Sequence, residues 1–181
     1  MKEEKKNIKK DGVEIFLRYS VGVIVAVLAV TFSIFYVVFR PLTVWLVYSF
    51  LKIFYEVNLI GISSIVVANY EIELIDACIA GSAYLLLFLL NIATRGMALK
   101  KRAFVFIFGS AALLLINVLR VIILITMLVN NSIAFDLTHK LFWYVMSTFF
   151  VVVVWFFSVW LFKLKAIPFY SDIKFILERK D

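Results

Sequence analysis

Four long apolar runs dominate the chain, and each is long enough to cross a lipid bilayer. They cover residues 19–39, 77–94, 103–129 and 141–162. A bilayer core of about 30 Å takes roughly 20 apolar residues in a helix. Because 65% of the 181 residues are hydrophobic and mean hydropathy is +1.04, these runs predict an all-α integral membrane protein. We expect one bundle of about four transmembrane helices and no separate soluble domain.

The first run, residues 19–39, is too long for the apolar part of a signal peptide and lacks an A-x-A cleavage site, so we expect a retained helix. Residues 41–55 are also apolar, but they begin with Arg40-Pro41 and are interrupted by Lys52. An interfacial or re-entrant helix is therefore expected there rather than a fifth span. Residues 57–70 are rich in β-branched side chains, which predicts a short extended segment outside the bilayer.

The distribution of Lys and Arg predicts the orientation. Residues 1–18 hold six of them, residues 95–102 hold four, and residues 163–181 hold five, while residues 40–76 and 130–140 together hold three. Cytoplasmic segments carry the excess of basic residues. The bias predicts a plasma-membrane protein with two cytoplasmic basic tails, residues 1–18 and 163–181. Between them lies a transmembrane domain, residues 19–162, in which residues 40–76 are interfacial or extracytoplasmic.

The composition also excludes several classes of function. The net charge of +7 is distributed as a topology signal, with no basic face and interleaved aromatic residues, so we expect no nucleic acid partner. The basic loop at residues 95–102 is also suited to contact with anionic membrane lipids. One His and one Cys cannot supply the ligands of a zinc site, and no Gly-rich phosphate loop is present. We therefore expect neither a metal nor another cofactor.

Three chemically distinctive residues fall at the same predicted end of the bundle. Cys78 is the only cysteine, His139 is the only histidine, and Arg120 is the only charge inside the run 103–129. Threading places Cys78 and His139 at the outer starts of their spans and Arg120 nine residues before the outer end of its own. An ionisable group inside a span is costly and is functional by default. Asn117, three residues earlier, projects from the same helix face.

In order, spacing and membrane context, these residues resemble the exosortase and archaeosortase family of membrane cysteine transpeptidases. The motifs are Asp76-Ala77-Cys78, then Asn117-Val118-Leu119-Arg120, then His139. The resemblance covers about half the chain, from Glu73 to Phe162. Many members have a small hydroxyl residue and Gly directly after the Cys, whereas Ile79 and Ala80 stand here, which is more similar to the archaeal branches.

The resemblance implies that Cys78 is the nucleophile, Arg120 an essential cation and His139 the third catalytic group. It implies substrates that are surface proteins with a C-terminal signal made of a short motif, a transmembrane helix and a basic cluster. Cleavage near the outer membrane face would then be followed by transfer of the acyl group to a lipid or glycolipid acceptor.

Chemistry alone supports related roles. A thiolate is the attacking species, so His139 is expected to take the thiol proton and Arg120 to stabilise the oxyanion. Asp136 is placed either to orient His139 or, with Thr138 as an equal candidate, to cap the last helix, and the capping role is favoured. Asp76 and Asp136 are both possible structural partners for Arg120. Two other functions stay open: a purely hydrolytic membrane peptidase, and a small transporter or assembly subunit in which Cys78 is incidental.

Overall fold

The computed structural model describes residues 2–31 and 33–164, so the expected basic tail lies outside the described residues from residue 165 onward. The chain forms seven α-helices, one π-helical turn and three strands within these ranges. In chain order they are α1 (Lys2–Thr31), α2 (Ile34–Leu51), β1 (Val57–Ile60), β2 (Ser64–Val67), β3 (Tyr70–Glu73), α3 (Asp76–Ile79), α4 (Gly81–Ala93), α5 (Leu99–Val129), α6 (Phe135–Leu141), η1 (Phe142–Met146) and α7 (Ser147–Leu161).

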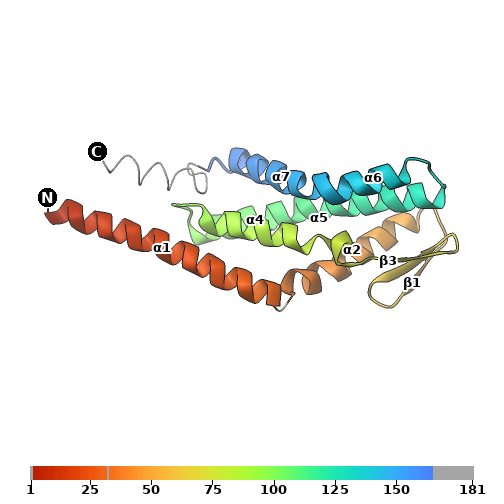
Figure 1. Cartoon of the computed structure of the whole chain (residues 1–181), viewed down its shortest axis with the longest axis horizontal. Helices are drawn as coiled ribbons and strands as arrows, with labels where there is room; N and C mark the ends of the chain where they lie inside the picture. The colour runs from red at the N-terminus through yellow and green to blue at the C-terminus, as the bar shows by residue number, and fades with distance from the viewer. Residues whose placement is uncertain (1, 32, 165–181) are drawn as a thin grey trace.

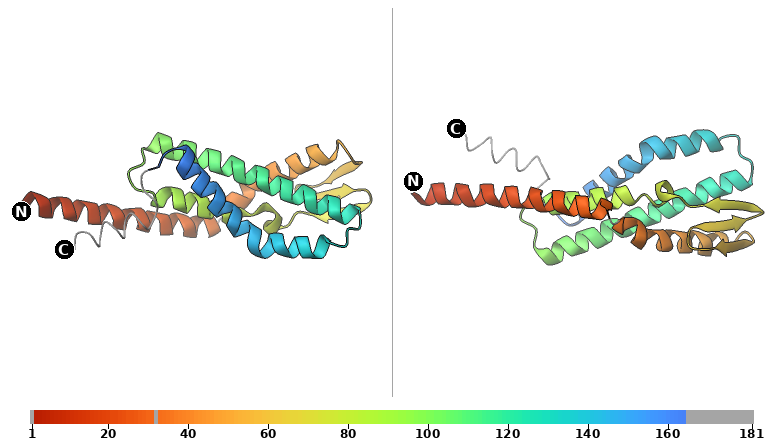
Figure 2. Two further views of the ribbon diagram at one scale, coloured as in Figure 1. Left: turned by 90° about the horizontal axis from the view of Figure 1, so that it is seen from above. Right: turned by 60° about the horizontal axis from the view of Figure 1, so that its bottom comes forward.

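The helices run up and down along one long axis (Figure 1). The N-terminus, the α4–α5 connection and the end of α7 lie toward one end, which we call the basic end. The sheet and the α5–α6 connection lie at the other, which we call the sheet end. Two further views preserve this arrangement (Figure 2). The chain therefore traverses the bundle four times, first through α1 and α2 together, then through α4, then α5, and last through α6, η1 and α7.

The expected first span, residues 19–39, is not one helix. α1 ends at Thr31 and α2 begins at Ile34, with Ser33 between them in the left-handed conformation at φ 49°. A non-glycine residue at positive φ interrupts the i to i−4 hydrogen-bond ladder. No Gly or Pro marks this break, so the apolar pattern alone could not predict it.

The second difference concerns Pro41, which the sequence placed at a helix boundary. In the structure Pro41 lies inside α2, a continuous helix of 18 residues. Proline removes one backbone hydrogen bond in a helix interior, and packing of the helix elsewhere offsets that cost. Thr43, Val44, Val47 and Leu51 of α2 are all buried. The helix covers most of residues 41–55, where we expected an interfacial or re-entrant helix, and it is long and apolar enough to cross a membrane.

The expected extended segment at residues 57–70 is confirmed, and it continues to Glu73. Its strands form an antiparallel sheet in the order β1-β2-β3. Val57 is opposite Val67 in the first pair, and Ile65 is opposite Ile72 in the second. Ile65 and Val67 are buried, so one face of the sheet packs against the helices while the other carries the polar positions.

The expected span at residues 77–94 is also divided. Ala80, at φ 58°, separates the single turn α3 from α4. At ~1.5 Å per residue the 13 residues of α4 extend for about 20 Å, less than a bilayer core. By contrast α5 is a continuous helix of 31 residues that contains the whole expected span 103–129. The last expected span, 141–162, is bent by 55° between Phe135–Tyr144 and Thr148–Leu161.

The described residues contain two helices long and apolar enough to cross a membrane, α2 and α5, and the bent pair at the C-terminal side adds a third if it counts as one span. The protein is thus a mostly helical chain with apolar helices suited to a membrane. The apolar parts of α1 and α4 are shorter.

Two groups of buried apolar side chains hold the bundle together. At the sheet end, α2, the sheet, α3 and the second half of α5 share one core, with Leu51, Ile65, Ile79 and Val121 among its members. Toward the basic end, α4, the first half of α5 and α7 share another, which includes Tyr84. The break between α3 and α4 lies where these two cores meet.

Candidate functional site

The site begins with the carbonyl groups that the break at Ala80 leaves without helical partners. Arg120 of α5 donates from Nη2 to the oxygen of Ala77 in α3 at 3.0 Å. Asn117 donates from Nδ2 to the oxygens of Cys78 at 2.7 Å and Ile79 at 3.4 Å. Backbone groups inside a membrane protein need internal partners. The two α5 side chains therefore hold α3 and the backbone of Cys78 in place.

Both donors are deeply buried, with exposed fractions of 6% for Arg120 and 5% for Asn117. The expectation that they project from one face of the helix is confirmed, because both reach the same short segment. Arg120 lies nine residues before the end of α5, or about 14 Å along its axis.

A pocket of about 330 Å³ adjoins this segment. It is lined by residues of α2, α3, α4, α5 and η1 together with Ala80. These are Tyr36, Asp76, Ala77, Ala80, Ser82, Arg120 and Trp143. The lining includes Asp76 and Ala77 before Cys78 and Ala80 after it, but not Cys78 itself. The guanidinium, a carboxylate and a hydroxyl side chain thus border a space large enough for part of a peptide.

A second, smaller pocket of about 20 Å³ is also lined by Arg120. Tyr84 and Asn117 line it, and among the described residues neither the Tyr84 hydroxyl nor the Asn117 Oδ1 has a hydrogen-bond partner. A space of this size accommodates about one water molecule, which needs two or more polar neighbours. This cavity is too small for any larger ligand.

The Cys78 thiol is half-buried and packs against the core at the sheet end. Burial raises the pKa of the Cys78 thiol above its ordinary value, while the charge of Arg120 and a backbone hydrogen bond at Ile75 act in the opposite direction. Cys78 is the third residue of a single helical turn, so a helix dipole contributes little to lowering this pKa.

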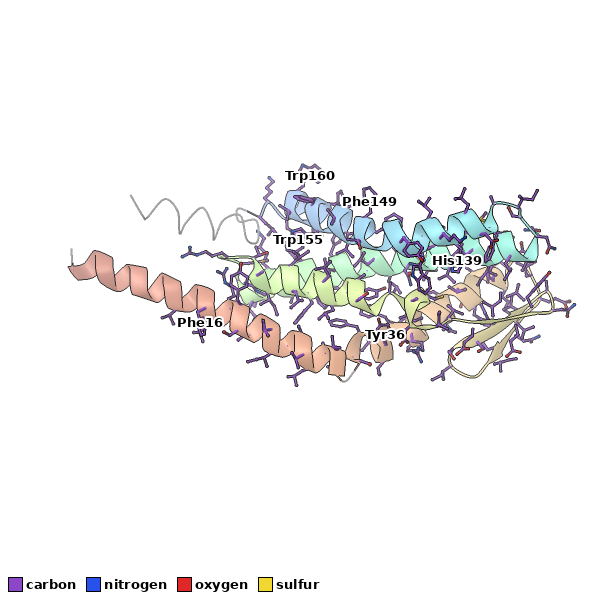
Figure 3. All side chains as sticks on the ribbon, viewed as in Figure 1. Phe16, Tyr36, His139, Phe149, Trp155 and Trp160 are labelled. Carbon is purple, nitrogen blue, oxygen red and sulfur yellow. The ribbon has the colours of Figure 1, made fainter. Side chains whose placement is uncertain are left out.

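Tyr36 closes one side of the pocket by packing directly on Gly81. A Cβ added at Gly81 would lie 2.6 Å from the Tyr36 ring. The glycine is thus needed for the close approach of α2 to the start of α4. Figure 3 places Tyr36 and His139 on different helices, both in the half of the molecule nearer the sheet.

His139 is exposed on α6 and does not contact Cys78. Its ring stacks on Phe135 with centroids 5.6 Å apart and meets Trp143 edge-on at 6.0 Å. Within the described part of the chain, the imidazole makes no hydrogen bond. Because Trp143 also lines the pocket, His139 lies one residue beyond its wall. The structure thus brings Cys78, Arg120 and Asn117 together and leaves His139 at the margin.

The expected partners of these groups are corrected by the structure. Asp76 pairs with Arg40 of α2 rather than with Arg120. Asp136 lies in the first turn of α6, but the capping residue is Ala134, so neither Asp136 nor Thr138 is the N-cap. Asp136 is exposed, and no hydrogen bond or ion pair joins it to His139 in the residues that the structure describes.

Sequence reasoning missed four residues of the site: Tyr36, Arg40, Ser82 and Trp143. Arg40 has the clearest signal, because it is a charge inside the apolar helix α2. The others belong to apolar or small-residue runs in which nothing distinguishes a pocket wall from ordinary packing. In the described ranges no group of three His, Cys, Asp or Glu side chains is placed to bind a metal.

The basic end contains a comparable arrangement without a thiol. Arg102 donates to the oxygens of Asn91 and of Ile92, the latter at 2.9 Å, and to the Thr94 oxygen at 3.0 Å. Arg18 donates to the Ala93 oxygen at 3.2 Å. Two arginines therefore satisfy the carbonyls at the end of α4, where a positive charge also complements the helix dipole.

The chain matches no protein-family model, and comparisons with curated proteins and with solved structures give no match.

Proposed function

We propose that this protein is a membrane-embedded cysteine transpeptidase that cleaves surface proteins near the outer face of the membrane and transfers the acyl group to a lipid acceptor. One observation carries the proposal. The backbone of the only cysteine is held by Asn117, and its neighbour Ala77 by Arg120, at the edge of a pocket that Arg120 lines. The resemblance of the three short motifs to the exosortase and archaeosortase family supports the same activity.

In this mechanism the Cys78 sulfur attacks the carbonyl carbon of the scissile bond and passes its proton to His139. The new carbon–sulfur bond leaves a tetrahedral oxyanion beside Arg120, whose charge stabilises it. Collapse of this intermediate breaks the carbon–nitrogen bond, and His139 returns the proton to the departing amine. A hydroxyl of the acceptor then attacks the thioester and restores the thiol.

The proposal requires His139 to leave the edge of Trp143 and face the thiol when substrate occupies the pocket. Trp143 lines the pocket and contacts the His139 ring, so the imidazole has to move past Trp143 to reach it. Since burial raises the pKa of the Cys78 thiol, a base is needed to remove its proton at neutral pH.

The proposed topology has four passages, with both termini in the cytoplasm and the sheet end outside. The distribution of Lys and Arg supports it. The fourfold traverse of the bundle agrees with this alternation (Figure 1). The pocket would then open close to the extracytoplasmic boundary.

The test uses reporter proteins fused to the C-terminal regions of surface proteins from the same cell that end in an apolar helix and a basic cluster. Wild-type protein is expected to shorten at least one reporter, and Cys78→Ala is expected to abolish this. Hydroxylamine should release the reporter from a thioester adduct with Cys78. Mass spectrometry of the new C-terminus distinguishes transfer, which leaves an adduct, from hydrolysis, which leaves a free carboxylate. Processing that persists in Cys78→Ala contradicts the proposal.

A non-enzymatic role is the second candidate, favoured by the hydrogen bond from Arg120 to the Ala77 oxygen. In that case Arg120 only satisfies a carbonyl freed by the helix break, and Cys78 is incidental. Such a protein would process none of the reporters.

A further inference from the structure

The sheet has an open edge that leads directly to the site. Among the residues that the structure describes, β3 pairs with β2 alone, and the backbone of Leu74 donates to the Ser63 oxygen at 2.8 Å. In an antiparallel pair, hydrogen-bonded residues alternate with residues whose backbone groups point away from the partner. The backbone N–H groups of Ile72 and Leu74 therefore point toward β2. Those of Glu71 and Glu73 point to the open edge.

This edge continues into the pockets. Only Leu74 and Ile75 separate β3 from α3, and a pocket of about 370 Å³ lies at this junction. Its lining includes Arg40 together with Glu73, Asp76 and Ala77. Asp76 and Ala77 also line the pocket beside Arg120, so the two spaces adjoin each other. A chain paired with β3 and continuing in the same direction would pass the segment that contains Cys78.

The side chains along the edge define what would fit it. Glu71 and Glu73 are exposed and share one face of the sheet, and neither forms an ion pair in the described ranges. On the opposite face, Ile72 packs against the core at the sheet end. A complementary strand therefore carries basic side chains on one face and apolar side chains on the other.

We propose that an extended peptide with alternating basic and apolar residues binds as a fourth strand on β3. The inference deepens the proposed function and rests on it in one respect: the peptide is the segment that precedes the transmembrane helix of the substrate. Parallel pairing with β3 directs its scissile bond toward Cys78. The helix that follows then enters the membrane beside α4, as the chain of this protein does after α3.

The opposite edge provides a matched control. In β1, pairing with β2 leaves Leu59 with its N–H directed outward, as Glu71 has on β3. Proline at either position removes one outward donor and no hydrogen bond inside the sheet. Glu71→Gln removes the charge but keeps the donor. These three variants separate strand pairing from charge and from damage to the sheet.

The first measurement is fluorescence anisotropy with a labelled eight-residue peptide of alternating Lys and Val. Wild-type protein and Leu59→Pro are expected to bind it equally, and Glu71→Pro about tenfold more weakly, which corresponds to one or two lost hydrogen bonds. Glu71→Gln should weaken binding less than Glu71→Pro. Absent binding, equal binding by both proline variants, or a loss with Glu71→Gln as large as with Glu71→Pro overturns the proposal.

Hydrogen exchange on the wild-type protein tests the same point without a substitution. The peptide should slow exchange at Glu71 and Glu73 and leave Leu59 unchanged; no difference between the edges contradicts strand addition. The reporter assay then separates the two proposals. Failure of the proposed function appears as processing that does not need Cys78. Failure of strand addition appears as Cys78-dependent processing that is equal in Glu71→Pro and Leu59→Pro.

Discussion

At both ends of the bundle, an arginine side chain donates hydrogen bonds to backbone carbonyl groups where a helix ends. At the basic end Arg102 and Arg18 satisfy the carbonyls that terminate α4, and at the sheet end Arg120 and Asn117 satisfy those that terminate α3. A helix that ends within or near a membrane needs such partners. A buried arginine in an apolar helix is therefore explained first by the backbone carbonyl groups to which it donates. It becomes a candidate for chemistry only when it also borders a pocket or a reactive side chain.

The surroundings of the arginine side chains differ between the two ends. The carbonyls at the basic end belong to a connection with no thiol and no imidazole, while Arg120 lines a pocket beside the only cysteine. Arg102 donates three hydrogen bonds to these carbonyls, and Arg120 donates to the Ala77 oxygen of α3. We therefore expect Arg102 to contribute mainly to stability and Arg120 mainly to the proposed chemistry, and experiment can break either expectation.

The largest expected effect separates the two arginines by activity. Arg120→Gln should lower the rate of Cys78-dependent reporter processing by about 10²–10³-fold, as for loss of one oxyanion donor. Arg102→Gln should leave the rate within a few-fold of wild type once the amounts of folded protein are matched. Equal losses in the two variants would reduce Arg120 to a structural role.

The second prediction concerns His139. His139→Gln should lower processing by about 10²-fold, because a general base is lost. The thermal unfolding midpoint should change little, since the ring is exposed and its aromatic contacts are with Phe135 and Trp143 of the same helical segment. Phe135→Leu serves as the control, because it alters the stacked neighbour and keeps the imidazole. Unchanged processing in His139→Gln removes this residue from the mechanism.

The third prediction concerns stability, for which the substitution of Arg102 should have the larger effect and that of Arg120 the smaller. Arg102→Gln should lower the free energy of unfolding by about 3 kcal/mol, because several buried carbonyls lose a charged donor together. Arg120→Gln should cost about 1–2 kcal/mol for its hydrogen bond to α3. Thermal unfolding in one detergent compares the two. A larger loss for Arg120→Gln would mean that the sheet end, not the basic end, limits stability.

The fourth prediction compares one glycine from each end. Gly81→Ala should destabilise the protein by about 1–3 kcal/mol, since the new methyl group overlaps the Tyr36 ring. Tyr36→Leu in the same chain should recover part of that loss. At Gly22 of α1 an added Cβ meets only Leu89 at 3.9 Å, so Gly22→Ala should be neutral or stabilising by about 0.5–1 kcal/mol. Equal effects at both glycines would exclude a close approach at Gly81.

The smallest expected effect is electrostatic. Because burial raises the pKa of the Cys78 thiol, the pH profile of its alkylation by iodoacetamide should lie on the alkaline side of that of an exposed cysteine. The charge of Arg120 lowers that pKa, so Arg120→Gln should shift the profile further toward alkaline pH. Arg102→Gln should leave the profile unchanged. A shift toward acid in Arg120→Gln would contradict the electrostatic contact.

The sequence predicts the helical membrane class and the extended segment well, because both depend on periodicity and composition that a short window reveals. It fails at Ser33, where no neighbouring Gly or Pro marks the break, and at Ala80, where the alanine and not the adjacent Gly81 takes the left-handed conformation. It also fails at Pro41, where burial of one helix face outweighs a local penalty.

At the site, the proximity of Cys78, Arg120 and Asn117 follows from threading and helix periodicity. The pairing of Asp76 with Arg40 does not, because it depends on the path of α2 after the break at Ser33. The distance between His139 and Cys78 depends in turn on the bend between α6 and α7, which no local pattern predicts.

Ala80 has a consequence for how the protein would work. An alanine held at φ 58° costs about 1–2 kcal/mol relative to a right-handed helical residue. The corner therefore persists because Arg120 and Asn117 hold the neighbouring carbonyl groups of Ala77, Cys78 and Ile79. In the proposed mechanism the fold thus places the sulfur in advance, and the substrate and His139 are the groups that move.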